Sequence, residues 1–392
     1  MRTMANRIEE LPPYLFAEVD KIKQDALNRG VDIIDLGVGD PDLPPPKAVI
    51  DRLIEGTGEK GSHNYPSYSG LPGLRQAFAQ WFEGRFGVSL DPDSEVLPLI
   101  GSKEGIGHIF LGHMDPGDEV LIPDPGYPVY AAGAILAGAV PRYFPLRKDN
   151  NFLPRIDELE ELVSPKTRML WLNYPSNPTT AVASLEFFEE ISRFAAERGI
   201  LICQDMAYSE ITFNGRKAVS LLQAPGGKDT GIEFHSLSKT FCMTGWRVGF
   251  AAGKAEAITA LAKVKTNLDS GIFIPIQKAA TTALLNCQKE AKEILETFEA
   301  RQKMFVTGLN DIGWKVPMPE ATFYVWAPVT EGYDSMSFCT YLMEETGIVC
   351  TPGVGFGSHG EGFVRMSLTI SDDRLKEALK RIKKLKTKWV FK

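Results

Sequence analysis

The chain has 392 residues, more than one ordinary domain, which favours two domains or one large domain with a smaller partner. A net charge of −7 argues against nucleic-acid binding, and no apolar stretch reaches the roughly 18 residues that a membrane span needs. The N-terminus lacks the long apolar region of a signal peptide, so we expect a cytoplasmic protein. The five cysteines and five histidines are scattered, and we expect reduced thiols and no metal site.

The first 46 residues are an N-terminal arm that ends in a run of three prolines. Residues 11–16 are predicted to form a proline turn, residues 17–28 a helix and residues 31–36 a short strand. The strand runs into a G-x-G segment, in which Gly39 allows a ligand to approach the backbone closely. A dinucleotide site is disfavoured because no third glycine or following helix completes its motif.

Residues 63–75 form a loop rich in tyrosine and glycine, followed by a predicted helix. Tyr65 in this loop either packs its ring, as such tyrosines often do, or offers its hydroxyl to a ligand.

From residue 95 onward, apolar runs alternate with helical patterns such as residues 185–197. The runs are residues 96–100, 119–122, 140–144, 168–173, 200–205, 232–235 and 248–252. Continuous apolar strands alternating with helices predict an α/β fold, with a mostly parallel seven-stranded sheet between helices. In such sheets ligands bind outside the carboxyl ends of the strands.

Polar residues follow several of these strand ends. Ser102 and Lys103 begin a helix after a glycine, which suits an anion, although a plain glycine-rich helix start is the alternative. Tyr127 lies in a proline turn, where its ring either packs or stacks on a ligand. Asn177 follows a further strand and can donate a hydrogen bond.

Two more strand ends carry charged residues. Asp205 ends an apolar strand, so it either has a cationic partner or caps the next helix. Lys239 lies between two hydroxyl residues, and a desolvated lysine of this kind can bind an aldehyde covalently. Arg247, eight residues later, keeps its charge and suits a phosphate.

The C-terminal part has the pattern of a smaller α+β domain. A long helical pattern over residues 274–310 is predicted to join it to the large domain. Short strands at 322–327, 347–351 and 363–368 and helices at 337–345 and 372–388 follow. Arg365 in the last strand can bind a carboxylate through two hydrogen bonds. The predicted boundaries are 1–46 for the arm and part of the small domain, 47–285 for the large domain and 286–392 for the small domain.

The order and spacing of these residues resemble those of the class I pyridoxal-phosphate (PLP) aminotransferases of fold type I, over nearly the whole chain. The segment S-x-S-K-x5-G-x-R-x-G around Lys239 carries the resemblance most specifically. It implies that Lys239 binds PLP and moves the proton of the reaction, and that Asp205 pairs with the ring nitrogen. The other cofactor-binding residues that it implies are Ser102, Lys103, Tyr127, Asn177, Tyr208, Ser236, Ser238 and Arg247.

The resemblance also implies a homodimer with shared sites, because Tyr65 in this family reaches the phosphate in the neighbouring subunit. Ser270 would join it from the same neighbour. Relatives that act as C–S lyases or in amine oxidation remain alternatives, since the fold does not choose among them. A PLP-sensing regulator would need an added DNA-binding domain, for which the N-terminus leaves no room.

The substrates that the resemblance implies are an amino acid and a 2-oxo acid. Arg365 and Gly39 would bind the carboxylate of the amino acid. Tyr127 and Asn177 would also contact the substrate. Several segments are similar to the LL-diaminopimelate branch of the family, which acts in lysine synthesis, and there Tyr14 and Lys103 would contact the substrate. A broader aspartate or alanine specificity is the alternative, although residues 266–280 lack the arginine of one aspartate-specific branch.

Overall fold

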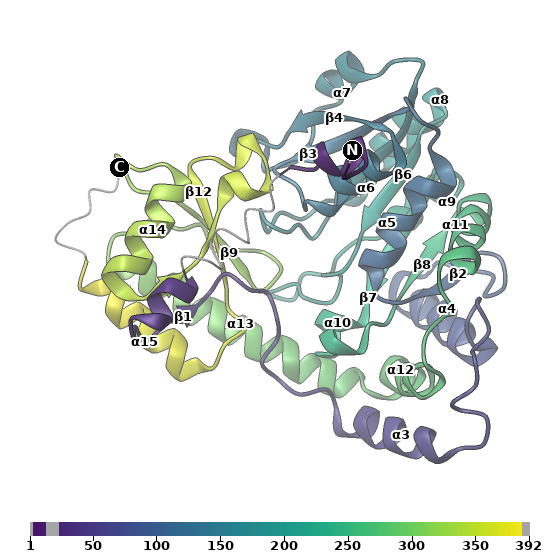
Figure 1. Ribbon diagram of the computed structural model, residues 1–392, viewed down its shortest axis with the longest axis horizontal. Coiled ribbons are helices and arrows are strands. Elements are labelled where there is room, and N and C mark those ends of the chain that lie inside the picture. The colour runs from purple at the N-terminus through teal and green to yellow at the C-terminus, as the bar shows by residue number, and fades with distance from the viewer. Residues whose placement is uncertain (1–2, 13–22, 386–392) are drawn as a thin grey trace.

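The computed structural model describes residues 3–12 and 23–385. A large domain built on a seven-stranded sheet and a smaller α+β domain lie side by side, and the long helix α13 (Gln288–Asp311) runs from one toward the other (Figure 1). The predicted helix at 17–28 lies partly outside the described residues and is helical from residue 23. The domain boundaries given above stay a prediction.

The large sheet contains all seven predicted strands. They are β2 (Val96–Leu99), β3 (Glu119–Asp124), β4 (Val140–Pro145), β5 (Thr167–Asn173), β6 (Leu201–Asp205), β7 (Gly231–Ser236) and β8 (Gly249–Gly253), in the order β2-β8-β7-β6-β5-β3-β4. Strand β8 runs antiparallel to both of its neighbours, and the other pairs are parallel. The predicted mostly parallel sheet is therefore confirmed.

Helices cover both faces of this sheet, which explains why its strands are continuously apolar. One face packs Trp171 and its alternate neighbours against α5 (Ser102–His113), α6 (Val129–Ala137) and α11 (Ala255–Leu268). Leu170 and Leu172 point to the other face, which α7 (Ile156–Leu162) and α8 (Leu185–Arg198) cover. At the β2–β8 side, α4 (Pro72–Phe86) and α12 (Ile274–Asn286) complete this layer, and α3 (Lys47–Gly58) packs on α12.

The small domain is built from two short sheets. Strands β9 (Tyr324–Pro328), β12 (Phe363–Ser367) and β11 (Thr351–Pro352) form an antiparallel sheet, and β10 (Ile348–Val349) pairs in parallel with β1 (Ile34–Asp35) from the N-terminal arm. Helices α14 (Ser335–Thr346) and α15 (Asp372–Lys383) pack here together with α13.

The predicted helical stretch over residues 274–310 is confirmed, with one break that the pattern did not predict. The chain forms two helices, α12 and α13, which meet at Cys287, where φ is −113° and ψ is 31°. Cys287 is fully buried in the core of the large domain, while Phe305, Val306 and Leu309 of α13 pack in the core of the small domain. The chain therefore turns where it passes from one core to the other.

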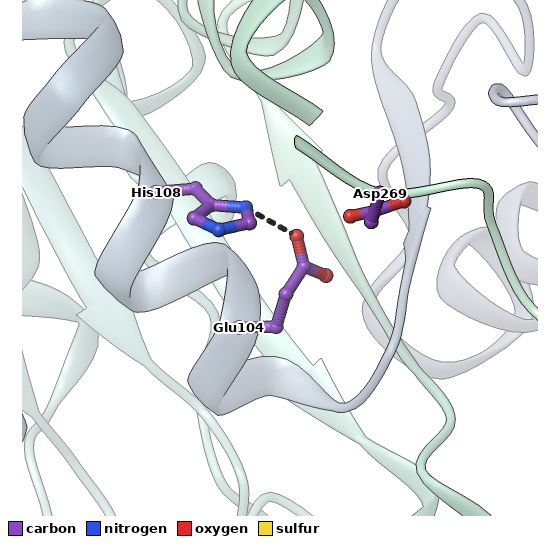
Figure 2. A group of neighbouring side chains, drawn as sticks. All are labelled: Glu104, His108 and Asp269. Atoms are coloured by element: carbon purple, nitrogen blue, oxygen red, sulfur yellow. Dashed lines mark ion pairs between the residues drawn. The ribbon is translucent and has the colours of Figure 1, made fainter. Parts of the chain in front are cut away.

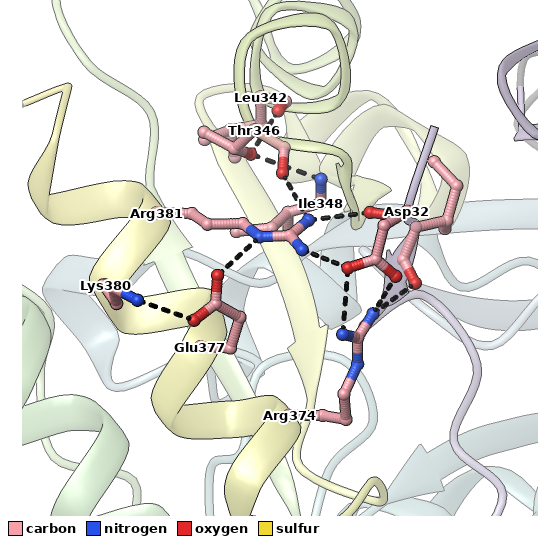
Figure 3. Close-up of polar contacts among 9 residues, drawn as sticks. Asp32, Leu342, Thr346, Ile348, Arg374, Glu377, Lys380 and Arg381 are labelled. Atoms are coloured by element: carbon pink, nitrogen blue, oxygen red, sulfur yellow. Dashed lines mark hydrogen bonds and ion pairs between the residues drawn. The ribbon is translucent and has the colours of Figure 1, made fainter. Parts of the chain in front are cut away.

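An ion-pair network joins the start of β1 to α15 (Figure 3). Arg374 donates to the Asp32 carboxylate at 2.7 Å, and Arg381 donates to the Asp32 carbonyl at 2.7 Å and to the Thr346 carbonyl at 3.0 Å. Hydrogen bonds from Arg374 and Arg381 lower the pKa of Asp32 to about 2. Among the described helices, none is long and apolar enough to cross a membrane.

Candidate active site

A cavity of about 380 Å³ lies at the carboxyl ends of β5, β6 and β7, between the two domains. It contains most of the predicted site residues. They are Gly39, Ser102, Lys103, Tyr127, Asn177, Asp205, Tyr208, Ser236, Ser238, Lys239, Arg247 and Arg365. The expectation that Asp205, Lys239 and Asn177 meet in one crevice is therefore confirmed, and the other nine residues line the same cavity. The role of each residue stays a prediction.

Lys239 lies on a short helix, α10 (Leu237–Thr240), that directly follows β7. The Ser236 hydroxyl accepts a hydrogen bond from the Ser238 backbone N–H at 3.2 Å and so starts this helix. The Nζ of Lys239 donates to the Gly39 carbonyl at 2.9 Å. Burial lowers the pKa of the Lys239 ammonium, which favours the neutral amine that can attack a carbonyl carbon.

One corner of the cavity has the chemistry of a phosphate site. The N-terminus of α5 begins at Ser102, after Gly101 with φ of 75°. A Cβ on Gly101 would lie 2.3 Å from Nη2 of Arg247, so only glycine lets the guanidinium stand this close to the helix start. Helix N-termini and guanidinium groups both favour a phosphate, and Ser236 and Ser238 add hydroxyls to the same cavity.

Asp205 is a buried carboxylate at the end of β6. Its oxygens accept hydrogen bonds from the Tyr130 hydroxyl at 2.9 Å and from the Ala207 N–H at 3.1 Å. Burial raises the pKa of Asp205 to about 6. A carboxylate so placed gains from a cationic partner, and the protonated ring nitrogen of PLP supplies one. The donor set of this site therefore fits PLP.

Arg365 enters the cavity from β12 of the small domain. It donates to Asn177 Oδ1 at 2.8 Å and to the Gly37 carbonyl at 2.7 Å. Its guanidinium carbon lies 4.2 Å from the ring centre of Tyr324 and 4.8 Å from that of Phe356. Since Arg365 uses the oxygen of Asn177, the amide nitrogen of Asn177 is the group that can donate to a ligand.

A pair of buried tyrosines forms another wall of the cavity. The hydroxyls of Tyr208 and Tyr324 lie 3.1 Å apart, and burial raises the pKa of Tyr208 well above its usual value, which keeps it a neutral donor. A Cβ on Gly39 would lie 1.8 Å from the Tyr324 hydroxyl. Only glycine therefore fits at position 39. The close approach of a ligand to this backbone stays a prediction.

Three residues of the site were not predicted from the sequence: Tyr130, Asn173 and Tyr324. Asn173 accepts from the Asn177 N–H at 2.8 Å and donates to the Asp205 carbonyl at 2.8 Å, so it joins two strand ends. The position of Asn173 at the end of a predicted strand was an available signal. Tyr130 and Tyr324 gave none, because tyrosines on a helix or strand usually serve the core.

Of the predicted residues that the structure describes, Tyr65 and Ser270 are not among those lining the cavity. Tyr14 lies outside the described residues. Tyr65 is 88% exposed, and Ser270 is exposed. Their role toward a neighbouring subunit stays a prediction.

Glu104, His108 and Asp269 gather beside the N-terminal half of α5 (Figure 2). Nδ1 of His108 lies 2.6 Å from Oε1 of Glu104. The ammonium of buried Lys265 lies 2.8 Å from Asp269 and 3.6 Å from Glu104, so a cation already compensates these carboxylates. The group therefore serves to hold α11 against α5.

The fold and the cavity together define a PLP-dependent enzyme of fold type I. The family description "aminotransferase class I and II" matches residues 31–382 of the chain. The chain belongs to this family, whose members are PLP-dependent and act on amino acids and 2-oxo acids.

Two relatives match the chain over nearly their full length. An LL-diaminopimelate aminotransferase from Moorella thermoacetica is 49% identical over 387 residues, which cover 99% of each chain. Another from Aquifex aeolicus is 49% identical over 386 residues, covering 98% of this chain and 100% of the relative.

Two solved structures resemble the fold closely. Substrate-bound BacF from Bacillus subtilis has a TM-score of 0.95 at 34% identity and covers 100% of this chain and 99% of its own. A probable N-succinyldiaminopimelate aminotransferase from Thermus thermophilus has a TM-score of 0.89 at 36% identity, covering 94% and 99%.

Proposed function

We propose that this enzyme catalyses the reversible transfer of an amino group between LL-diaminopimelate and 2-oxoglutarate, which gives tetrahydrodipicolinate and L-glutamate. The reaction in the reverse direction, toward LL-diaminopimelate, is the one that serves lysine synthesis. The observation that carries the proposal is the 49% identity to LL-diaminopimelate aminotransferases over 99% of each chain. The site supports it through Lys103, which lines the cavity with its Nζ 5.7 Å from the ring centre of Tyr127. A cation there suits the distal carboxylate of a substrate that carries two.

Different residues of the cavity would have different roles in transamination. PLP supplies an aldehyde that bonds covalently to amines and a ring that withdraws electrons from the substrate Cα. Lys239 would hold the cofactor and, as the free amine, take the proton from Cα. Arg365 would bind the α-carboxylate, because a guanidinium binds a carboxylate through two parallel hydrogen bonds, and so fix which bond at Cα points toward Lys239.

The polar groups around the ring would set its charge. Asp205 would pair with the ring nitrogen and keep it protonated, while Asn177 and Tyr208 would donate to the ring oxygen. Ser102, Ser236, Ser238 and Arg247 would bind the phosphate at the corner described above. We further propose a homodimer in which Tyr65 and Ser270 complete the site of the neighbouring subunit.

Half-reactions test the substrate. The PLP form is mixed separately with LL-diaminopimelate, meso-diaminopimelate, glutamate, aspartate or alanine, and its conversion to the pyridoxamine form is followed by absorbance. We expect fast conversion by LL-diaminopimelate and glutamate, and none in Lys239→Ala with any amino acid. Fast conversion by aspartate or alanine, with none by LL-diaminopimelate, would replace the proposed substrate by the broader specificity and leave the transamination chemistry in place.

A further inference from the structure

The loop between β11 and β12, residues 353–362, reaches from the small domain to the large domain. It contains two short turns of helix, η4 (Gly353–Phe356) and η5 (Ser358–Gly360). Its partner in the large domain is the carboxyl end of β3, where Asp124 is the last residue of the strand.

The Asp124 carboxylate binds this loop through three contacts. Oδ2 accepts from the Ser358 hydroxyl at 2.7 Å and lies 3.0 Å from Nδ1 of His359, and Oδ1 accepts from the His359 N–H at 2.9 Å. The Asp124 side chain is 8% exposed, so water competes little for these oxygens.

The backbone of the loop is shaped for this contact. Gly357 has φ of 132°, and a Cβ on it would lie 2.1 Å from Oδ1 of Asp124. One residue earlier, the Phe356 carbonyl accepts a hydrogen bond from the Gly126 N–H at 2.7 Å. Backbone and side-chain groups of the loop therefore both contact residues 124–126 of the large domain.

The contact connects two parts of the active site. On the loop, Phe356 packs against the guanidinium of Arg365, with 4.8 Å between ring centre and guanidinium carbon. On the large domain, Asp124 precedes by three residues Tyr127, which lines the cavity. A second cavity, of about 510 Å³, lies between Tyr127, Asp124 and Phe356.

We propose that Asp124 is a positioning residue, which binds residues 357–359 and holds the small domain against the large domain, so that Arg365 and Tyr127 keep the spacing that binds substrate. We name Asp124, Ser358 and His359 the interdomain latch. The inference needs an amino-acid substrate that Arg365 binds, and it is independent of which amino acid that is.

The same strand supplies a matched control. Glu119 is the first residue of β3, and its carboxylate accepts a hydrogen bond from Ser164 at 2.6 Å and is paired with Arg142 at 2.5 Å. Its side chain is 8% exposed, like that of Asp124, but its partners belong to the large domain. Glu119→Ala therefore removes a comparable carboxylate without touching the interface between the domains.

The test compares Asp124→Ala, the double variant Ser358→Ala/His359→Ala and Glu119→Ala in the PLP-loaded enzyme. Hydrogen exchange of the peptide covering residues 353–362 is measured without substrate, and KM and kcat are measured with the amino acid that converts the PLP form fastest. We expect the two latch variants to exchange about tenfold faster there and to raise KM about tenfold, with kcat changed less than about twofold. The reason is that the apparent affinity falls with the fraction of closed molecules.

Glu119→Ala is expected to match the wild type in both measurements. The proposal is overturned if Glu119→Ala and Asp124→Ala speed exchange in the peptide equally, or if kcat falls in the latch variants while KM stays constant. If Asp124→Ala does not fold, the double variant decides, since Ser358 and His359 are both exposed. Exchange needs no substrate, so a failed assay with LL-diaminopimelate would leave this test intact.

Discussion

The Asp205 carboxylate illustrates how single residues prepare this site. Burial raises the pKa of Asp205 to about 6 and so favours the neutral carboxyl, whereas a cationic ring nitrogen needs the charged carboxylate as its partner. The Tyr130 hydroxyl acts in the other direction, because a hydrogen bond to the carboxylate favours its charged form. Tyr130 is itself held by stacking on Trp171, with 4.8 Å between ring centres. Its phenol, whose pKa burial raises well above the usual value, stays a neutral donor.

Tyr130→Phe should therefore weaken PLP binding in a pH-dependent way. In the wild type, affinity of the apoenzyme for PLP should fall as the pH drops through about 6, because Asp205 is then protonated. Losing the hydrogen bond raises the pKa of Asp205 further, so in Tyr130→Phe the fall should begin about one pH unit higher. Titrations of the apoenzyme with PLP between about pH 5 and pH 8 measure both midpoints.

Tyr174→Phe is the control for this comparison. Tyr174 is also buried, but its hydroxyl donates to the Phe152 carbonyl at 2.7 Å. The pH midpoint of PLP binding in Tyr174→Phe should equal that of the wild type. Equal midpoints in all three proteins would show that Tyr130 does not act on Asp205.

At this scale the sequence predicted most of the site residues at strand ends, with the exception of Asn173, and missed Tyr130 and Tyr324, which support them. Asp205, Asn177 and Lys239 follow apolar runs, so their meeting at one edge of the sheet could be derived from the alternation alone. Tyr130 contacts Asp205 across 75 positions of the chain. No local pattern carries that pairing, because it depends on how α6 packs on the sheet.

At the scale of elements, the apolar runs predicted every strand of the large sheet, since burial on both faces leaves a continuous signal. The break at Cys287 was missed for a physical reason. No glycine or proline marks it, and the helical pattern continues on either side, so the turn is imposed by the two cores that α12 and α13 join.

The attachment of α15 to β1 gives a prediction about pH. Asp32 has a pKa of about 2 in the folded protein against 3.8 ordinarily, so its contribution to stability is present above the ordinary value and is lost as the pH falls toward 2. Asp32→Asn should lower the urea midpoint at pH 7. Its difference from the wild type should stay constant down to about pH 5 and shrink as the pH falls from there toward 2.

Asp149→Asn provides the reference for Asp32→Asn. Asp149 is an exposed carboxylate whose partner among the described residues is Arg155, at 3.1 Å within the same loop. An exposed, isolated ion pair contributes little to the free energy of unfolding, so Asp149→Asn should unfold like the wild type at every pH. A pH-independent difference for Asp32→Asn would instead assign its effect to packing or to backbone changes.

At the scale of the whole molecule, the active site lies between two domains, and separate segments of the chain contribute its residues. The N-terminal arm supplies Gly39, the large domain supplies Lys239 and Asp205, and the small domain supplies Arg365. The sequence predicted this arrangement through the resemblance of its motifs to a family, and the comparisons confirm the family. The spacing between the domains could not be predicted, because it depends on contacts such as the interdomain latch.

The proposed dimer gives the last prediction, which concerns Tyr65. Tyr65 is 88% exposed and is not among the residues lining the cavity of its own chain, so its hydroxyl can serve a site only if a second copy brings it there. Lys239→Ala and Tyr65→Phe should each be impaired alone. Unfolded together in equal amounts and refolded with PLP, they should regain about a quarter of the wild-type activity, because half of the dimers are then mixed and each mixed dimer has one complete site. Refolding each variant alone controls for recovery. If Tyr65 acts within its own subunit, a mixed dimer contains no complete site in the Lys239→Ala copy and only an impaired one in the other, so activity would not exceed the average of the two variants.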